Sequence, residues 1–156
     1  MSQQFSDFDD RISIAYPIIS IAFSRFMLDT QRRVMVELGL DLESSYIWGT
    51  LAQYNLSGVV QPTIDPKKLI WTQFGMRGLM KPARLTDISE VSRLPVETVR
   101  RKLKVLATQN RVEQLPDKTW LGVVGGDAYS QEFVKDSIRR MLDVADLMVQ
   151  VMQRVK

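Results

Sequence analysis

The chain has 156 residues and a formal net charge of +3, and it contains neither His nor Cys. This length favours one domain, or one domain with helical extensions, and allows a sizeable core. Without Cys there is no disulfide framework, zinc finger or thiolate nucleophile, and without His the usual proton shuttle near neutral pH is missing. We therefore expect neither an enzyme nor a bound cofactor, and any metal would need a site made of oxygen ligands alone.

The small net charge conceals a basic block in the middle of the chain. Residues 1–43 carry a net charge of −3, whereas residues 77–111 carry nine basic and three acidic side chains, a net charge of +6. Such a block is typical of proteins that bind a polyanion, because each Lys or Arg near a phosphate releases condensed counterions. A solvated basic helix face that binds nothing is the alternative.

The N-terminal part of the chain is acidic at first and then strongly apolar. Residues 1–10 are expected to form a frayed tail, and they lack the basic start of a secretory signal, which favours a cytoplasmic protein. Pro17 and Arg25 interrupt the apolar run that spans residues 12–28. The run therefore predicts a buried helix, bent at the proline, and we expect no membrane span.

We expect residues 11–156 to form a single domain that begins with N-terminal helices over residues 11–55. The first helix should end near Leu38, because Gly39 accepts the left-handed conformation that closes helices. A second helix is predicted from Leu42 to Tyr54.

Turn-forming residues then mark a loop, and a third helix is predicted from Pro66 to about Met80. The aromatic side chains of these helices either line an effector pocket or belong to the core, and their helical spacing does not distinguish the two. They are Tyr46, Trp48, Trp71 and Phe74.

Two short helices joined by a tight turn are predicted within residues 66–124. Thr86 is a favourable N-cap for the first, and Pro95 ends it because proline disfavours the helical conformation in the preceding residue. The second helix covers residues 96–109. The apolar contacts are Ile88, Val91 and Leu94 on the first helix and Val99, Leu103 and Leu106 on the second. Two such helices, the second rich in outward basic residues, form a helix-turn-helix pattern.

A β-hairpin is predicted directly after these helices, over residues 112–123. Pro116, Asp117 and Lys118 are turn formers, and the residues on either side alternate as paired strands do. Trp120 is expected to fill the core between the hairpin and the helices. A helix-turn-helix followed by a hairpin is the winged-helix arrangement.

The C-terminal segment, residues 127–156, predicts a long helix with an apolar seam. Its apolar residues recur in alternating steps of four and three, as in a heptad repeat: Val134, Ile138, Met141, Ala145, Met148 and Met152. Such a helix must bury its apolar face against its own domain or against a second subunit. We expect a homodimer here, with packing on the first helix as an alternative that is compatible with it.

The segment TDISEVSRLPVETVRRKLKVL resembles bacterial winged helix-turn-helix transcriptional regulators, in which A-E-x-x-x-L-x-x-x-T-V-R-R-x-L-x-x-L leads into the wing. Ser89, Pro95 and Val96 stand where these families usually carry alanine, a glycine-containing turn and serine. The similarity covers about 40 of the 156 residues, with about 80 before the module and about 30 after it. That order is most similar to the MarR family. It implies a mainly α fold with a small β-hairpin wing, a winged helix-turn-helix module flanked by N- and C-terminal dimerisation helices.

The outward face of the second short helix carries the chemistry for reading DNA. An α-helix fits the major groove, and an arginine there can bind O6 and N7 of guanine, with roughly 1–3 kcal/mol of discrimination. We expect Arg100 to read a base and Lys118 to contact the backbone or minor groove. The candidate DNA-binding residues are Arg84, Thr86, Val96, Glu97, Thr98, Arg100, Arg101, Lys104 and Lys118.

The sequence as a whole predicts a dimeric, sequence-specific regulator that binds double-stranded DNA. The recognition helix, residues 96–109, would lie in the major groove, with the wing, residues 112–123, on the backbone or minor groove. A small-molecule effector is a further expected partner. The alternative is a winged-helix protein–protein interaction module whose basic face meets an acidic partner.

Overall fold

The computed structural model describes residues 2–59, 77–123 and 128–155, and it is mainly helical with a small two-stranded antiparallel sheet. The chain divides into two compact units. One combines the residues up to Leu38 with those from Ser130 onward, and the other spans Gly39–Tyr129. The predicted third helix lies largely outside the described residues.

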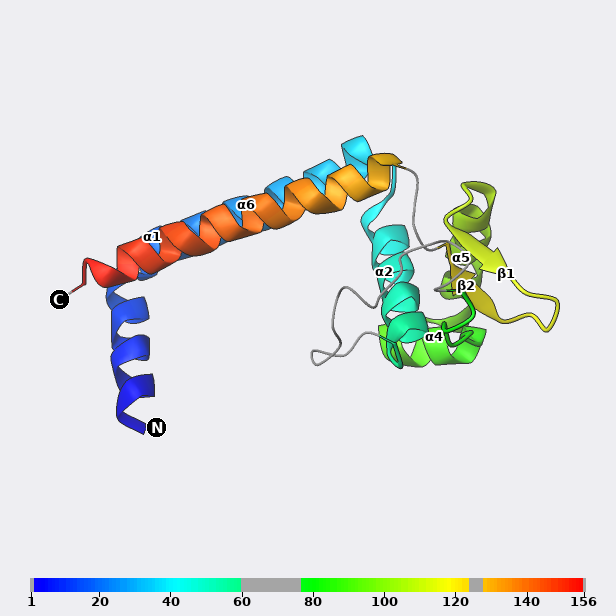
Figure 1. Cartoon of the computed structure of the whole chain (residues 1–156), viewed down its shortest axis with the longest axis horizontal. Coiled ribbons are helices and arrows are strands. Elements are labelled where there is room, and N and C mark those ends of the chain that lie inside the picture. Colours follow the sequence, from blue (N-terminus) through cyan, green and yellow to red (C-terminus); the bar gives the residue numbers. More distant parts are fainter. Residues whose placement is uncertain (1, 60–76, 124–127, 156) are drawn as a thin grey trace. The chain divides into compact units, whose positions relative to one another are not determined.

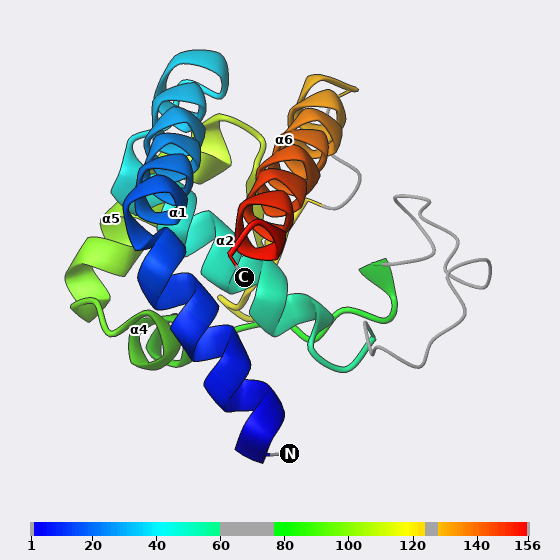
Figure 2. The same ribbon diagram turned by 90° about the vertical axis from the view of Figure 1, so that its left-hand side faces the viewer.

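The first unit is a pair of long helices, α1 (Ser2–Glu37) and α6 (Ala128–Gln153), which run antiparallel and side by side (Figures 1 and 2). The residues expected to be frayed belong to α1 from Ser2 onward. The N-terminal part of α1 turns away from α6 in Figure 1. Pro17 lies inside this helix. It accounts for the bend, because it lacks the N–H that would bond the carbonyl four residues earlier and its ring crowds that carbonyl.

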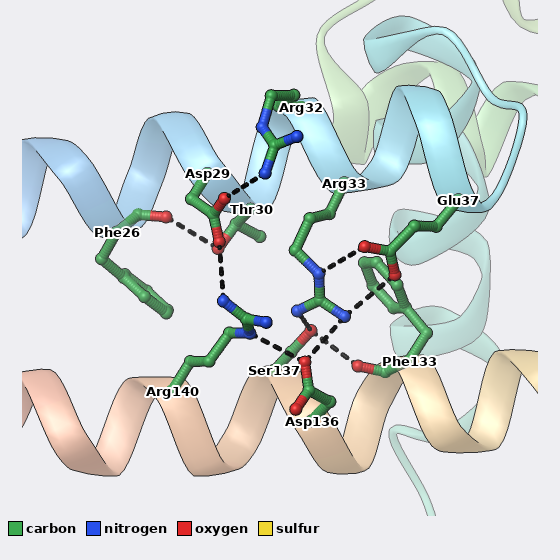
Figure 3. A network of polar contacts seen from close by, with 10 residues as sticks. All are labelled: Phe26, Asp29, Thr30, Arg32, Arg33, Glu37, Phe133, Asp136, Ser137 and Arg140. Carbon is green, nitrogen blue, oxygen red and sulfur yellow. Dashed lines mark hydrogen bonds and ion pairs between the residues drawn. The ribbon is translucent and has the colours of Figure 1, made fainter.

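Polar side chains join α1 to α6 in the network of Figure 3, centred on Arg33, which is 5% exposed. Its guanidinium donates to Glu37 at 2.8 and 3.0 Å, pairs with Asp136 at 3.0 Å and lies 4.8 Å from the centre of the Phe133 ring. Hydrogen bonding to Arg33 lowers the pKa of Glu37 and, reciprocally, raises the pKa of Arg33. The charge of the buried arginine is thus compensated on both helices.

A second link lies one helical turn away in the same network. Arg140 donates to Asp136 at 2.7 Å and reaches Asp29 across the helix pair at 3.3 Å (Figure 3). Hydrogen bonding to Arg140 lowers the pKa of Asp136, and hydrogen bonding to Arg32 lowers that of Asp29. The pairs 29–140 and 33–136 are offset by four residues in opposite directions, so both fix the same antiparallel register.

The prediction of a buried first helix is wrong for the chain taken alone. Ala15 and Val34 are buried, but large apolar side chains are exposed around much of α1 and α6, because each helix is apolar on more sides than the other can cover. The exposed residues are Phe8, Ile14, Tyr16, Ile18, Ile21, Phe23, Met27, Leu28, Met35 and Val36 of α1, and Val134, Ile138, Met141, Leu142, Leu147 and Val149 of α6.

One part of α1, Asp7–Glu37, is long and apolar enough to cross a bilayer, with a mean hydropathy of 1.3 and 6% of the apolar window buried. Core helices and signal sequences meet the same criterion, so the segment by itself assigns no location.

The second unit is built on α2 (Leu42–Leu56), which contacts α4 (Leu85–Ser92), α5 (Val96–Thr108) and the strand β2 (Trp120–Gly122). Its fully buried side chains include Ile47, Leu51, Ile88, Val99, Leu103 and Leu106. The prediction for α5 is confirmed in its buried residues and, to within one residue, in its bounds. On α4, however, Val91 is 57% exposed, because this short helix buries a single side, around Ile88.

The predicted hairpin is present, with β1 (Val112–Gln114) antiparallel to β2 and Glu113 opposite Leu121. Trp120 is 3% exposed, as expected for a core residue. It also forms a bridge with Ala83, in which each backbone N–H donates to the other's carbonyl at 3.0 and 2.8 Å. This extra pairing ties the segment before α4 to the hairpin and was not predicted.

The fully buried side chain of Asn55 connects α2 to this small sheet. Its amide nitrogen donates to the carbonyls of Lys81 and Trp120, at 2.8 and 3.3 Å, and its oxygen accepts from the Gly122 N–H at 2.8 Å. One amide thus satisfies backbone groups on both segments that meet at the Ala83–Trp120 bridge.

Replacing Asn55 by Ala should therefore lower the free energy of unfolding of this unit by about 2–4 kcal/mol, because buried backbone groups lose their partner. Urea unfolding followed by tryptophan fluorescence measures this, since all three tryptophans lie within residues 39–129. Gln53→Ala, on the exposed side of the same helix, is the control and should change little. Equal stability of both variants would contradict the assigned role.

Asp41 caps α2 and pairs with Lys102 of α5. Its carboxylate accepts from the Ser44 N–H at 2.8 Å and from the Lys102 ammonium at 2.7 Å. The hydrogen bond from Lys102, followed by those from Ser44, lowers the pKa of Asp41 from 3.8 to about 2. The cap and the ion pair therefore join the start of α2 to the middle of α5.

Because the pKa of Asp41 is lower in the folded chain than in the unfolded chain, its contribution to stability is complete above about pH 5. It should be lost as the pH falls towards 2. Asp41→Ala should cost about 1–2 kcal/mol at pH 7, whereas Asp41→Asn keeps a good N-cap and should cost less. The asparagine variant should also lose less stability than the parent between pH 5 and pH 2 in urea titrations. Parallel pH curves for parent and Asp41→Asn would contradict this assignment.

Candidate nucleic-acid interface

The outer face of α5 carries most of the residues predicted to contact DNA. Val96, Glu97, Arg100, Arg101 and Lys104 are exposed, and Thr98 is half-buried beside the core residue Val99. The exposed face of α5 is therefore polar and mainly basic from Glu97 to Lys104, with Val96 and Val105 as exposed apolar residues beside it.

Several of these basic groups are already paired within the chain. Arg100 forms an ion pair with Glu97, and Arg101 approaches Glu43 of α2 at 3.9 Å. Lys104 forms no ion pair with the described residues, whereas Lys102, which was not singled out from the sequence, pairs with both Asp41 and Glu43 at 2.7 and 3.2 Å.

Lys102 is 14% exposed on its side chain and lies on the inner side of α5. The sequence indicated this inner position, because Lys102 follows Val99 by three residues and precedes Leu103 by one. This spacing places it at the edge of the buried face of α5. Its pKa is raised, first of all by the hydrogen bond to Asp41. Lys102 is therefore a structural cation rather than part of the outer surface.

The start of α4 differs from the prediction. Arg84, not Thr86, is the N-cap residue, and its backbone N–H donates to the Asp87 carboxylate at 2.9 Å. The same carboxylate accepts from the Tyr54 hydroxyl at 3.1 Å, so Asp87 fixes the cap to α2. Arg84 and Thr86 are both exposed at this end of α4.

The hairpin tip places Lys118 at the surface in a left-handed conformation, φ +67°. Asp117 shapes the turn by accepting from the Thr119 hydroxyl at 2.6 Å and from its N–H at 3.0 Å, and these hydrogen bonds lower the pKa of Asp117. The neighbouring acidic group partly offsets the positive charge of Lys118.

The turn between α4 and α5 contains an exposed basic residue that is not among the predicted DNA-binding residues. Arg93 ends α4 in the left-handed conformation, φ +57° and ψ +27°, and its side chain is exposed. A signal was present in the sequence, since a tight turn between two helices without a glycine requires another residue to take up this conformation.

The proposed aromatic pocket is not assembled from its described members. Tyr46 is 53% exposed and donates its hydroxyl to the Ser92 carbonyl at 3.3 Å. Trp48 lies under the guanidinium of Arg111, 4.9 Å from the ring centre. The two side chains thus serve different contacts, and Trp71 and Phe74 lie outside the described residues.

The candidate dimerisation residues are located on α6. Val134, Ile138, Met141 and Ala145 are exposed, whereas Met148 and Met152 are half-buried. In the parts of the chain that the structure describes, no group of three or more Asp and Glu side chains could hold a metal ion.

Comparisons with protein-family models, with curated proteins and with solved structures gave no match to this chain.

Proposed function

We propose that the chain is a sequence-specific DNA-binding regulator of the winged helix-turn-helix type, with α5 in the major groove and the β1–β2 hairpin as the wing. The observation that carries the proposal is the order of the elements: two helices joined by a tight turn, the second with a basic outer face, followed directly by an antiparallel hairpin. The bridge between Ala83 and Trp120 supports it, because it anchors the hairpin to the segment that leads into the first of these helices.

The exposed residues of α5 have distinct roles in this proposal. Lys104 supplies a phosphate contact, and Arg100 exchanges its ion pair with Glu97 for a guanine edge. Because Arg100 must first give up its ion pair with Glu97, its contact with guanine releases less free energy than the same contact made by an unpaired arginine. Arg100 therefore contributes less affinity than an unpaired arginine would, and its main role is to discriminate between base pairs at its site.

Lys104→Ala should weaken binding to all duplex sequences alike and reduce the slope of log K against log salt by about one. Arg100→Ala should instead relax the preference for one base pair, at a cost of about 1–3 kcal/mol on the preferred site. The site is obtained by selecting bound duplexes from a random pool, and affinities are then measured at several salt concentrations.

Lys135→Ala is the matched control, because it removes one exposed lysine from α6 and should leave the slope unchanged. A parent protein that enriches no sequence and binds duplex DNA with no salt dependence would overturn the proposal.

The alternative, a protein–protein interaction module, is favoured by the ion pairs that already engage Arg100 and Arg101. It predicts binding to acidic polypeptide and none to DNA.

We further propose a homodimer formed through the exposed apolar faces of α1 and α6. Contiguous exposed apolar surface of this extent is typical of an interface rather than of a monomer. A bilayer is a poor partner for α6, because charged residues recur along it: Glu132, Lys135, Asp136, Arg139, Arg140, Asp143 and Asp146. A second copy supplies the same mixed surface in return, as two-fold interfaces do.

Ile138 and Leu142, which are 47% and 58% exposed and one helical turn apart, test this interface. Ile138→Gln combined with Leu142→Gln removes four buried apolar side chains per dimer. At about 1.5 kcal/mol or more for each, this should raise the dimer dissociation constant at least a hundredfold in sedimentation experiments. Arg139→Gln introduces the same residue at a polar position and should leave the dimer intact. A monomeric parent at micromolar concentration would refute the dimer.

A further inference from the structure

The turn between α4 and α5 holds an arginine in a conformation that suits glycine. Arg93 has φ +57°, and the other non-glycine residues with positive φ in the described ranges are Asn110 and Lys118. Asparagine tolerates this region because its short side chain bonds locally, whereas a long basic side chain gains nothing there. Both of the basic residues in this set are exposed, and both border the elements assigned to DNA binding.

Neighbouring side chains fix this turn. The Ser89 hydroxyl donates to the Leu94 carbonyl at 2.6 Å, and the Leu94 N–H donates to the Ser92 hydroxyl at 3.3 Å. The Ser92 carbonyl accepts from the Tyr46 hydroxyl at 3.3 Å, and Ser92 itself is buried. Strained backbone persists where the surrounding structure determines it in this way, and it is concentrated at functional sites.

The side chain of Arg93 does not contribute to holding the turn. It forms no ion pair or side-chain hydrogen bond with the residues that the structure describes, whereas Arg100, Arg101 and Lys102 of α5 are all engaged with carboxylates. The fold therefore bears the strain of a non-glycine residue and leaves its guanidinium directed to the solvent. Only the residues Leu94 and Pro95 separate it from the start of α5.

We propose that Arg93 is a phosphate-binding residue that anchors the DNA backbone beside the N-terminus of the recognition helix. This inference rests on the proposed function. A guanidinium presents two parallel N–H donors to a phosphate, and contacts of this kind set the register of a recognition helix without reading sequence. The turn fixes the backbone of Arg93 relative to α5, so binding has to order only its side chain.

Stability and binding should change in opposite directions when Arg93 is replaced by Gly. The glycine relieves the left-handed strain, so the Tm should stay the same or rise by up to about 4 °C. Affinity for duplex DNA should fall about five- to tenfold at physiological salt, equally for the selected site and for unrelated sequences, and the salt slope should decrease by about one. Arg93→Lys, which keeps the charge, should retain most of the slope.

Asn110→Gly is the matched control, because it relaxes a left-handed turn of nearly the same φ without removing a charge. It should leave DNA affinity and salt slope at parent values. If the parent binds DNA and Arg93→Gly binds with the same affinity and slope, the inference is overturned and the proposed function stands. A lower Tm for Arg93→Gly would assign a structural role to the arginine and also overturn it. If the parent binds no DNA, the proposed function fails and this inference fails with it.

Discussion

The architecture of the second unit, Gly39–Tyr129, depends on the buried side-chain amide of Asn55. Asn55 lies at the end of α2 and satisfies backbone groups from the segment before α4 and from β2, so three parts of the chain meet at one side chain. The Ala83–Trp120 bridge forms at the same point, and Trp120 closes the core above it. Because the hairpin has only three residues in each strand, its own ladder could not hold it in a fixed position. α2 and the bridge at Ala83 therefore help to fix the hairpin, which also contacts α5 directly through β1.

Carboxylates at the start of α2 also neutralise part of the positive charge of α5. Asp41 and Glu43 at the start of α2 engage Lys102 and approach Arg101, so part of the basic block is neutralised inside the unit. The net charge of +6 over residues 77–111 overstates the positive field, since the compensating carboxylates come from a segment that is distant in sequence. What remains at the surface is a smaller set of basic groups that form no ion pair with the described residues, among them Arg93, Lys104 and Lys118.

Local signals in the sequence predicted the helices and the hairpin, and contacts between distant segments account for what they missed. The bounds of α5, the stop at Gly39 and the turn at Pro116–Lys118 follow from apolar spacing and from residues with restricted backbone preferences. The bridge between Ala83 and Trp120 has no local signal in the sequence, because a single extended residue shows no alternation of polar and apolar side chains. Thr86 was chosen as a cap by residue type, whereas Asp87, held by Tyr54, places the cap at Arg84. The division into two units likewise depends on long-range packing, which assigns α2 to the basic block.

Between α1 and α6 lies a network of ion pairs, whereas many large apolar side chains of both helices are exposed. This distribution bears on how the two helices choose their register. Apolar faces alone would allow α6 to pack on any α1, in any register and from either chain, because hydrophobic burial is not directional. The network around Arg33 is directional, since its guanidinium is compensated only when Glu37 and Asp136 are both in place. A slip of one helical turn would move Asp136 away from Arg33 and leave only Glu37, on the same helix, to compensate the buried charge. The ion pairs thus select the register within a chain, and they leave the apolar surface outside them exposed for the proposed association between chains.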